Sequence, residues 1–130
     1  MRLLLDTHIW LWGIADSDRL SHRVSRAIQN PRNSLWLSPL SIYEACLLSS
    51  RGRIAAAGDD KWIEMAFVQL PVNEAPLTTQ VALAWRDLGM DRGDPVDALL
   101  AATAKVLDLT LVTADERLMG IKGISVLANR

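Results

Sequence analysis

The sequence lacks several features by which particular classes of protein are recognised. It contains a single cysteine, Cys46, so no internal disulfide can form, and we expect the reducing cytoplasm as its compartment. Apolar residues make up 50% of the chain, but no run approaches the ~20 consecutive apolar residues that cross a bilayer. No secretory signal is visible at the N-terminus. We therefore expect a soluble protein with no membrane partner.

An excess of charge of one sign is also missing. Fifteen acidic and fourteen basic residues give a net charge of −1, so the overall field does not indicate a nucleic-acid partner. Two histidines and one cysteine form no ligand-spaced set, which argues against a zinc site. No repeat, low-complexity run or linker is present. Residues 51–60 are interpreted as a connection within one domain that spans residues 1–130.

What the chain does contain is an alternation of short aliphatic segments with longer helical ones. This alternation predicts an α/β fold in which helices cover a central, mostly parallel sheet of four to five strands. The predicted strands are residues 2–6, 34–38, 72–76, 110–113 and 124–128. The predicted helices are residues 7–15, 21–30, 38–52, 59–70, 78–89 and 94–108, with a short turn at 115–120.

Acidic residues recur where a predicted strand ends or a predicted helix begins. They are Asp6, Glu44, Asp94, Asp97 and Asp115. Ligands of open parallel sheets bind at the carboxyl ends of the strands, where helices begin. The sequence therefore raises the question of whether these carboxylates form one site.

Helix capping is the simpler explanation, because carboxylates stabilise helix N-termini. Capping suffices for Asp94, which precedes a proline. The segment TADE, from Thr113 to Glu116, has the form of a capping box and explains Glu116. Asp97 is explained in part, since an acid at the third helical position can serve a cap or a site. Asp115 is left without a structural role.

Capping fits two further acids poorly. Pro39 indicates that its helix begins after Ser38, which places Glu44 in the second turn, beyond the unpaired backbone N–H groups. Thr7 is available to cap the first helix, so we expect that Asp6 is not needed for capping. Both acids are therefore candidates for chemistry.

Convergence of Asp6, Glu44, Asp97 and Asp115 would be unfavourable without a cation, because like charges repel and raise each other's pKa. Oxygen ligands that leave room for water suit Mg²⁺ or Mn²⁺. Acid clusters that hold such ions stabilise the attacking and leaving oxygens of phosphodiester cleavage. The residue types thus predict metal-assisted hydrolysis of a phosphate ester.

Four segments, in order, then match one known family: LLLDTHIWLW (3–12), LSPLSIYEA (37–45), DPVDALLAATA (94–104) and LVTADERL (111–118). In these segments the chain resembles PIN-domain ribonucleases, and specifically the VapC-type toxins of bacterial toxin–antitoxin pairs. The resemblance implies a three-layer α/β/α PIN-like domain. It also implies an RNA substrate, a cognate antitoxin protein and a homodimer.

The resemblance assigns the metal ligands residue by residue. Asp6 and Asp97 would bind Mg²⁺ or Mn²⁺ directly. Glu44 and Asp115 would complete the catalytic quartet, through water or at a second ion, and Asp94 matches an additional acid of the family. Cleavage would proceed by attack of activated water and leave 5′-phosphate and 3′-hydroxyl ends.

Two accessory residues and one departure accompany this assignment. Thr113 would orient a water or a phosphate, and Arg117 is the best candidate for a phosphate contact, since arginine offers two parallel donors. Val96 and Ala98 stand where related sequences often have phenylalanine and arginine. The departure removes a possible phosphate contact rather than a metal ligand.

Other functions stay open at this point. A PIN-type nuclease of housekeeping RNA processing would share the same acids. An acid-cluster phosphatase would want an acid two residues after its nucleophile, where the chain has His8, and a receiver domain would want a pair of acids after the first strand. A catalytically silent binding module is the third alternative.

The tryptophans are interpreted mainly as packing residues. Trp10 and Trp12 are two positions apart on a predicted helix and cannot face the same way. We expect one in the core and the other at a subunit or antitoxin interface. Trp36, Trp62 and Trp85 are expected to pack, and Cys46 is expected to be a small buried side chain.

Overall fold

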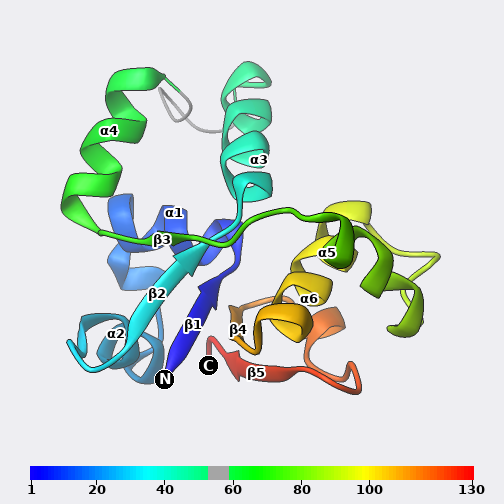
Figure 1. Cartoon of the computed structure of the whole chain (residues 1–130). Helices are drawn as coiled ribbons and strands as arrows, with labels where there is room; N and C mark the ends of the chain where they lie inside the picture. Colours follow the sequence, from blue (N-terminus) through cyan, green and yellow to red (C-terminus); the bar gives the residue numbers. More distant parts are fainter. Residues whose placement is uncertain (53–58) are drawn as a thin grey trace.

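A five-stranded sheet forms the centre of the computed structural model, which describes residues 1–52 and 59–130 (Figure 1). The strands are β1 (Arg2–Leu5), β2 (Ser34–Leu37), β3 (Asn73–Glu74), β4 (Thr110–Thr113) and β5 (Ser125–Ala128). All pairs are parallel, in the order β3-β2-β1-β4-β5. The predicted parallel sheet is confirmed, with β3 shorter than the predicted strand at 72–76.

Six helices of the described residues surround this sheet. They are α1 (Thr7–Ala15), α2 (His22–Gln29), α3 (Pro39–Ser50), α4 (Asp60–Gln69), α5 (Thr79–Ala84) and α6 (Pro95–Leu107). Short 3₁₀ turns are η1 (Ser17–Arg19), η2 (Trp85–Asp87) and η3 (Glu116–Leu118). The predicted helix at 78–89 is divided into α5 and η2, and η1 was not expected.

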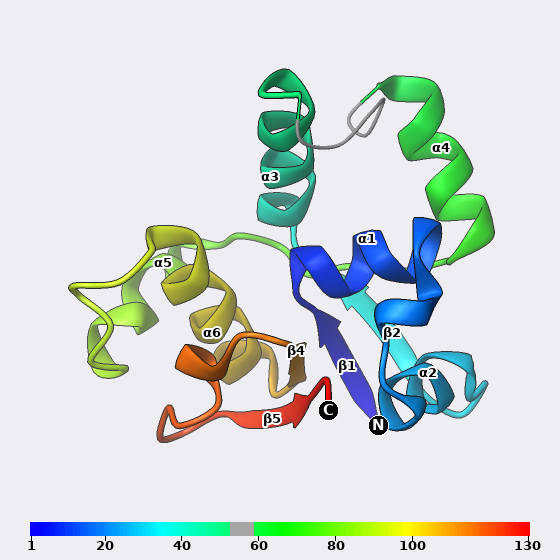
Figure 2. The ribbon, with the colours of Figure 1, turned by 180° about the vertical axis from the view of Figure 1, so that it is seen from behind.

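The strand β1 shows how the layers are built. Its side chains alternate between the two faces, so Leu3 and Leu5 pack with α1, α2 and α4, whereas Leu4 packs with α6. All three leucines are fully buried. Helix α5 packs on α6 at the outside of that second face. The result is the expected α/β/α arrangement (Figures 1 and 2).

Helices α3 and α4 extend beyond the carboxyl ends of the strands, as both views show. Helix α3 begins as expected, with Ser38 as N-cap and Pro39 in the first turn. It buries only Ser41 and Ala45. Cys46, expected to be buried, is exposed because α3 projects from the body of the fold.

Part of the predicted connection at 51–60, residues 53–58, lies outside the described residues. In the rest of the chain, none of the helices is both long enough and apolar enough to cross a membrane.

Candidate active site

One cavity gathers every acid singled out in the sequence. Its volume is about 300 Å³. Five carboxylates line it, those of Asp6, Glu44, Asp94, Asp97 and Asp115. The other lining residues are His8, Trp12, Ala114 and Arg117. Parallel strands β1, β2 and β4 end at the same edge, so the segments that follow them meet there. The geometry therefore brings five candidate site residues together from four separate segments.

Asp6 lies between β1 and α1 and is held at both oxygens. Its Oδ1 accepts a hydrogen bond from the backbone N–H of Thr7 at 2.8 Å, and its Oδ2 accepts one from the Thr113 hydroxyl at 2.6 Å. Asp6 is thus the N-cap of α1, and the expectation that Asp6 is not needed for capping is wrong. Burial raises the pKa of Asp6, and the hydrogen bonds from Thr113 and Thr7 partly offset this rise.

The side chain of Thr7 explains why it does not cap. Thr7 is the first residue of α1 and is almost fully buried. Its hydroxyl donates to the carboxylate of Glu44 and lies 3.0 Å from the Ser41 hydroxyl, which connects α1 to α3. Glu44 is in the second turn of α3, as expected. Burial raises the pKa of Glu44, and the charge of Asp6 adds to the rise.

Asp94 and Asp97 lie at the start of α6, Asp94 just before the helix and Asp97 in its first turn. Asp94 is the N-cap and accepts from the backbone N–H of Val96 at 2.8 Å, as predicted. Burial, followed by the charges of Asp94, Asp6 and Asp115, raises the pKa of Asp97 to about 6. The pKa of Asp97 is therefore raised first by burial and then by the charges of three neighbouring acids.

Asp115 and Arg117 form a fork-shaped ion pair at η3. Arg117 Nε lies 3.0 Å from Asp115 Oδ1, and a terminal nitrogen lies 2.7 Å from Oδ2. The same nitrogen is 3.6 Å from Asp97 Oδ2. Hydrogen bonds from Arg117 hold the pKa of Asp115 below its usual value. Arg117 is thus a cation placed between two of the acids.

The capping box predicted from Thr113 to Glu116 is wrong. Asp115 is the N-cap of η3 and accepts from the backbone N–H of Arg117 at 3.0 Å. The Thr113 hydroxyl instead accepts from the N–H of Asp115 and donates to Asp6. Thr113 is fully buried, so its hydroxyl lies within the protein and orients Asp6.

The donor set fits a hard divalent cation. All five acids offer oxygen, and among the described residues Arg117 pairs with two of them, Asp97 and Asp115. No three acid, histidine or cysteine side chains of the described residues lie close enough together to enclose a metal ion. An open arrangement of this kind suits Mg²⁺, which keeps several of its waters and takes one or two carboxylates.

Residues 3–123 match the family of the PIN domain. The chain belongs to the PIN-domain family. This PIN domain is 33% identical over 118 residues to Ribonuclease VapC22 of Mycobacterium tuberculosis, over 89% of this chain and 88% of the relative. The VapC-type resemblance in the sequence is confirmed by this relative.

Solved structures show the same PIN fold. The structure of VapBC2 from Rickettsia felis bound to a DNA fragment from their promoter matches with a TM-score of 0.75 and 16% identity, over 98% of both chains. A toxin–antitoxin complex from Klebsiella pneumoniae matches with a TM-score of 0.64 and 20% identity, again over 98% of both chains. At these identities the likeness establishes the fold.

Two residues of this PIN domain were not expected at the cavity. His8 and Trp12 both line it, with their ring centroids 5.8 Å apart on successive turns of α1. The Arg19 guanidinium lies 4.7 Å from the Trp12 ring centroid. Trp10 is fully buried, so the expectation of one core tryptophan is confirmed. The four-residue spacing of His8 and Trp12 was the signal that they share a helix face.

Proposed function

We propose that the protein is a metal-dependent endoribonuclease that hydrolyses RNA phosphodiester bonds as the toxin of a toxin–antitoxin pair. The observation that carries this proposal is the convergence of five carboxylates on one cavity, in a chain that is 33% identical to a protein named as a ribonuclease. Carboxylate clusters of this kind serve phosphoryl chemistry through divalent ions.

In this proposal Asp6 and Asp97 are the direct ligands of Mg²⁺ or Mn²⁺. Glu44 and Asp115 complete the site through water or a second ion, and Asp94 adds charge at its rim. A bound ion would supply activation of water and neutralisation of the phosphate charge. Ligand orientation comes from the chain itself: Thr113 fixes one oxygen of Asp6, and the backbone N–H of Thr7 fixes the other.

Arg117 has two roles in the proposal. Without a divalent ion, it neutralises Asp115 and part of the charge of Asp97. Its side chain is 76% exposed, so it can leave these carboxylates at little cost in packing. Once an ion takes over the carboxylates, the guanidinium is available to contact an RNA phosphate through two parallel donors.

The proposed partners are an antitoxin protein and a second copy of the chain, in the cytoplasm. Support comes from the named relative and from the similar fold of a chain in a toxin–antitoxin complex. A cavity with five acids and one arginine also suits a basic antitoxin side chain, which would compete with the metal ion.

Cleavage of RNA by the purified protein tests the enzymatic part of the proposal. A panel of structured transcripts is incubated with Mg²⁺ or Mn²⁺, with EDTA, and with two variants, Asp6→Asn and Asp97→Asn. Asp18→Asn is the matched control, since this exposed acid lies on η1 outside the cavity. We expect cleavage by wild type and Asp18→Asn alone, products that carry 5′-phosphates, and no cleavage in EDTA. Equal cleavage by Asp6→Asn and wild type would overturn the assignment.

The alternatives give different outcomes. A phosphatase would turn over p-nitrophenyl phosphate and leave every transcript intact. A housekeeping nuclease would cut RNA without arresting growth when its gene is induced. A toxin should arrest growth, and co-expression of a small neighbouring gene for a DNA-binding protein should restore it.

A further inference from the structure

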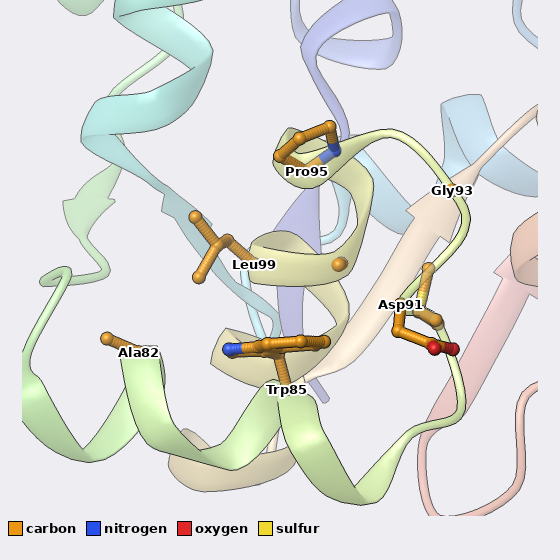
Figure 3. A pocket seen from close by; sticks show the side chains of 8 residues that line it. Ala82, Trp85, Asp91, Gly93, Pro95 and Leu99 are labelled. Carbon is orange, nitrogen blue, oxygen red and sulfur yellow. The ribbon is translucent and has the colours of Figure 1, made fainter.

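A second cavity lies directly beside the acidic one and has a different character. Its volume is about 410 Å³, within the roughly 300 to 1,000 Å³ typical of small-molecule sites. Apolar side chains of α5, η2 and α6 form most of its wall, among them Ala82, Trp85, Ala98 and Leu99. Figure 3 shows this cavity from close by.

The indole of Trp85 gives the cavity a flat wall. In Figure 3 the ring is seen edge-on, and Pro95 and Leu99 of α6 lie across the cavity from one of its faces. Trp85 was expected to be a packing residue, but it is only partly buried and one face borders the cavity. A space between a flat ring and an apolar helix turn suits a planar occupant, because aromatic groups stack face to face with an offset.

The first turn of α6 separates the two cavities. Asp94 and Asp97 line the acidic cavity, whereas Pro95 and Ala98 line the apolar one. Each of these acids is next in sequence to a residue of the other cavity, and a helix with its side chains is about 10 to 12 Å across, so the two cavities flank one helical turn. A ligand that joins a phosphate to a flat apolar group can therefore occupy both cavities at once.

Charge in the cavity indicates which part of such a ligand enters. Among the described residues, its lining contains neither lysine nor arginine, so it offers no partner to a phosphate. Asp91 also lines this cavity (Figure 3). A carboxylate accepts hydrogen bonds from amino groups such as those of cytosine and adenine. The uncharged, planar, amino-bearing part of a nucleotide fits this lining.

We propose that the Trp85 cavity binds an unpaired nucleobase of the RNA, adjacent to the phosphodiester that is cleaved. This inference rests on the proposed function and names a specificity subsite for it. The base stacks on the indole of Trp85, and Asp91 favours bases that carry an amino group. The substrate is accordingly single-stranded next to the cleavage site, since a paired base would first have to be extruded from its stack at a cost in free energy.

Binding is tested without cleavage, using the Asp6→Asn protein labelled with 5-fluorotryptophan. Fluorine NMR reports each of the five tryptophans separately, and the Trp85 signal is the one missing from the Trp85→Phe spectrum. Hexanucleotides of cytidine or uridine, and an abasic hexanucleotide, are titrated. We expect a saturable shift of the Trp85 signal with both base-containing strands, at lower concentration for cytidine, and none with the abasic strand.

Two results would overturn the inference. One is an unchanged Trp85 signal while another tryptophan signal shows that the cytidine strand binds. The other is a Trp85 signal that depends on protein concentration without RNA and is unaffected by the strand, which would make the cavity an interface between copies of the chain.

Cleavage kinetics supply an independent readout. Replacing Trp85 by leucine keeps apolar volume but removes stacking, so KM for a single-stranded substrate should rise about tenfold with kcat within about twofold. Trp85→Phe should stay close to wild type. Trp36→Leu is the control, because Trp36 lies on β2 outside both cavities. A merely structural role for Trp85 would lower kcat through loss of folded enzyme and leave KM unchanged.

Failure of this inference can be told apart from failure of the proposed function. If wild type cleaves RNA and Trp85→Leu has an unchanged KM, only the base subsite is wrong. If wild type cleaves no RNA, the proposed function is wrong, and the NMR titration still decides whether the cavity binds a base.

Discussion

The two halves of the acidic cavity hold their carboxylates in different ways. In the half formed by α1 and α3, Asp6 and Glu44 accept hydrogen bonds from the hydroxyls of buried threonines. In the half formed by α6 and η3, Asp97 and Asp115 face the exposed guanidinium of Arg117. The first half is fixed by packing, whereas the second is neutralised by an exposed side chain, which in the proposed function is exchanged for a metal ion without disturbing the core.

This difference separates two tasks that a metal site must perform. A buried hydroxyl orients a carboxylate but leaves its charge in place, and burial raises the pKa of Asp6 and Glu44. An exposed arginine neutralises the charge of a carboxylate but does little to fix its orientation. We expect substitutions in the first half to damage stability and activity together. Substitutions in the second half should change ion binding and pH dependence with little loss of stability.

The largest effect is expected from Thr113→Val. Valine has the same shape but removes the hydroxyl donor to Asp6 Oδ2 and leaves the N–H of Asp115 without that acceptor, while the Thr7 N–H still donates to Asp6 Oδ1. The free energy of unfolding should fall by about 2 kcal/mol, and cleavage should fall with it. Urea denaturation measures the first and RNA cleavage the second. Thr110→Val, on the same strand, is the control and should change both far less.

A smaller effect, of opposite sign, is expected from Asp97→Asn in EDTA. An unfolded aspartate has a pKa near 3.9, whereas burial and neighbouring acids raise that of Asp97 to about 6. The folded state therefore binds the proton more tightly. Ionisation costs stability that is intact below about pH 4, declines between pH 4 and 6, and stays lost above pH 6.

Asparagine cannot ionise, so the variant should be more stable than wild type at pH 8 and equal to it at pH 4. After allowance for solvent screening we expect a gain of about 1 kcal/mol at pH 8. Thermal unfolding at both pH values in EDTA measures it. A variant that is less stable than wild type at pH 8 would show that Asp97 is held by interactions other than those described above.

The smallest effect on stability is expected from Arg117→Ala. The side chain is exposed, so the melting temperature should stay within about 2 °C of wild type. Its removal frees Asp115 and Asp97, and Mn²⁺ should bind severalfold more tightly, while KM for RNA rises. Arg92→Ala, an exposed arginine outside the acidic cavity, should change neither quantity. Weaker Mn²⁺ binding by Arg117→Ala would contradict the exchange of cations.

Helix and strand boundaries were predicted correctly where the local sequence signals agree with each other. Helix α1 begins and ends at the predicted residues, 7 and 15, and the strand at 110–113 is also as predicted. The helix predicted at 78–89 fails where η2 interrupts it before Gly89, which has a φ of +68°. A tighter turn and a left-handed glycine leave little signal in a helix-like run of apolar residues.

The sequence predicted that the acids could converge, and they do line one cavity. It did not predict the hydrogen bonds that hold them in place. Capping and chemistry were treated as alternatives, yet Asp6 caps α1 and also lines the acidic cavity. The bond from Thr113 to Asp6 spans 107 positions, and the bond from Thr7 to Glu44 spans 37. Local patterns describe neighbours along the chain, so they cannot show which distant hydroxyl a carboxylate will meet.

Mn²⁺ binding tests the central claim, that these carboxylates form one metal site, most directly. Free Mn²⁺ is measured by electron paramagnetic resonance during titration of wild type, the double variant Asp6→Asn and Asp97→Asn, and the control Asp18→Asn. We predict saturable binding to wild type and the control, and at least about a hundredfold weaker binding to the double variant, which should remain folded. Equal binding to all three proteins would contradict the claim.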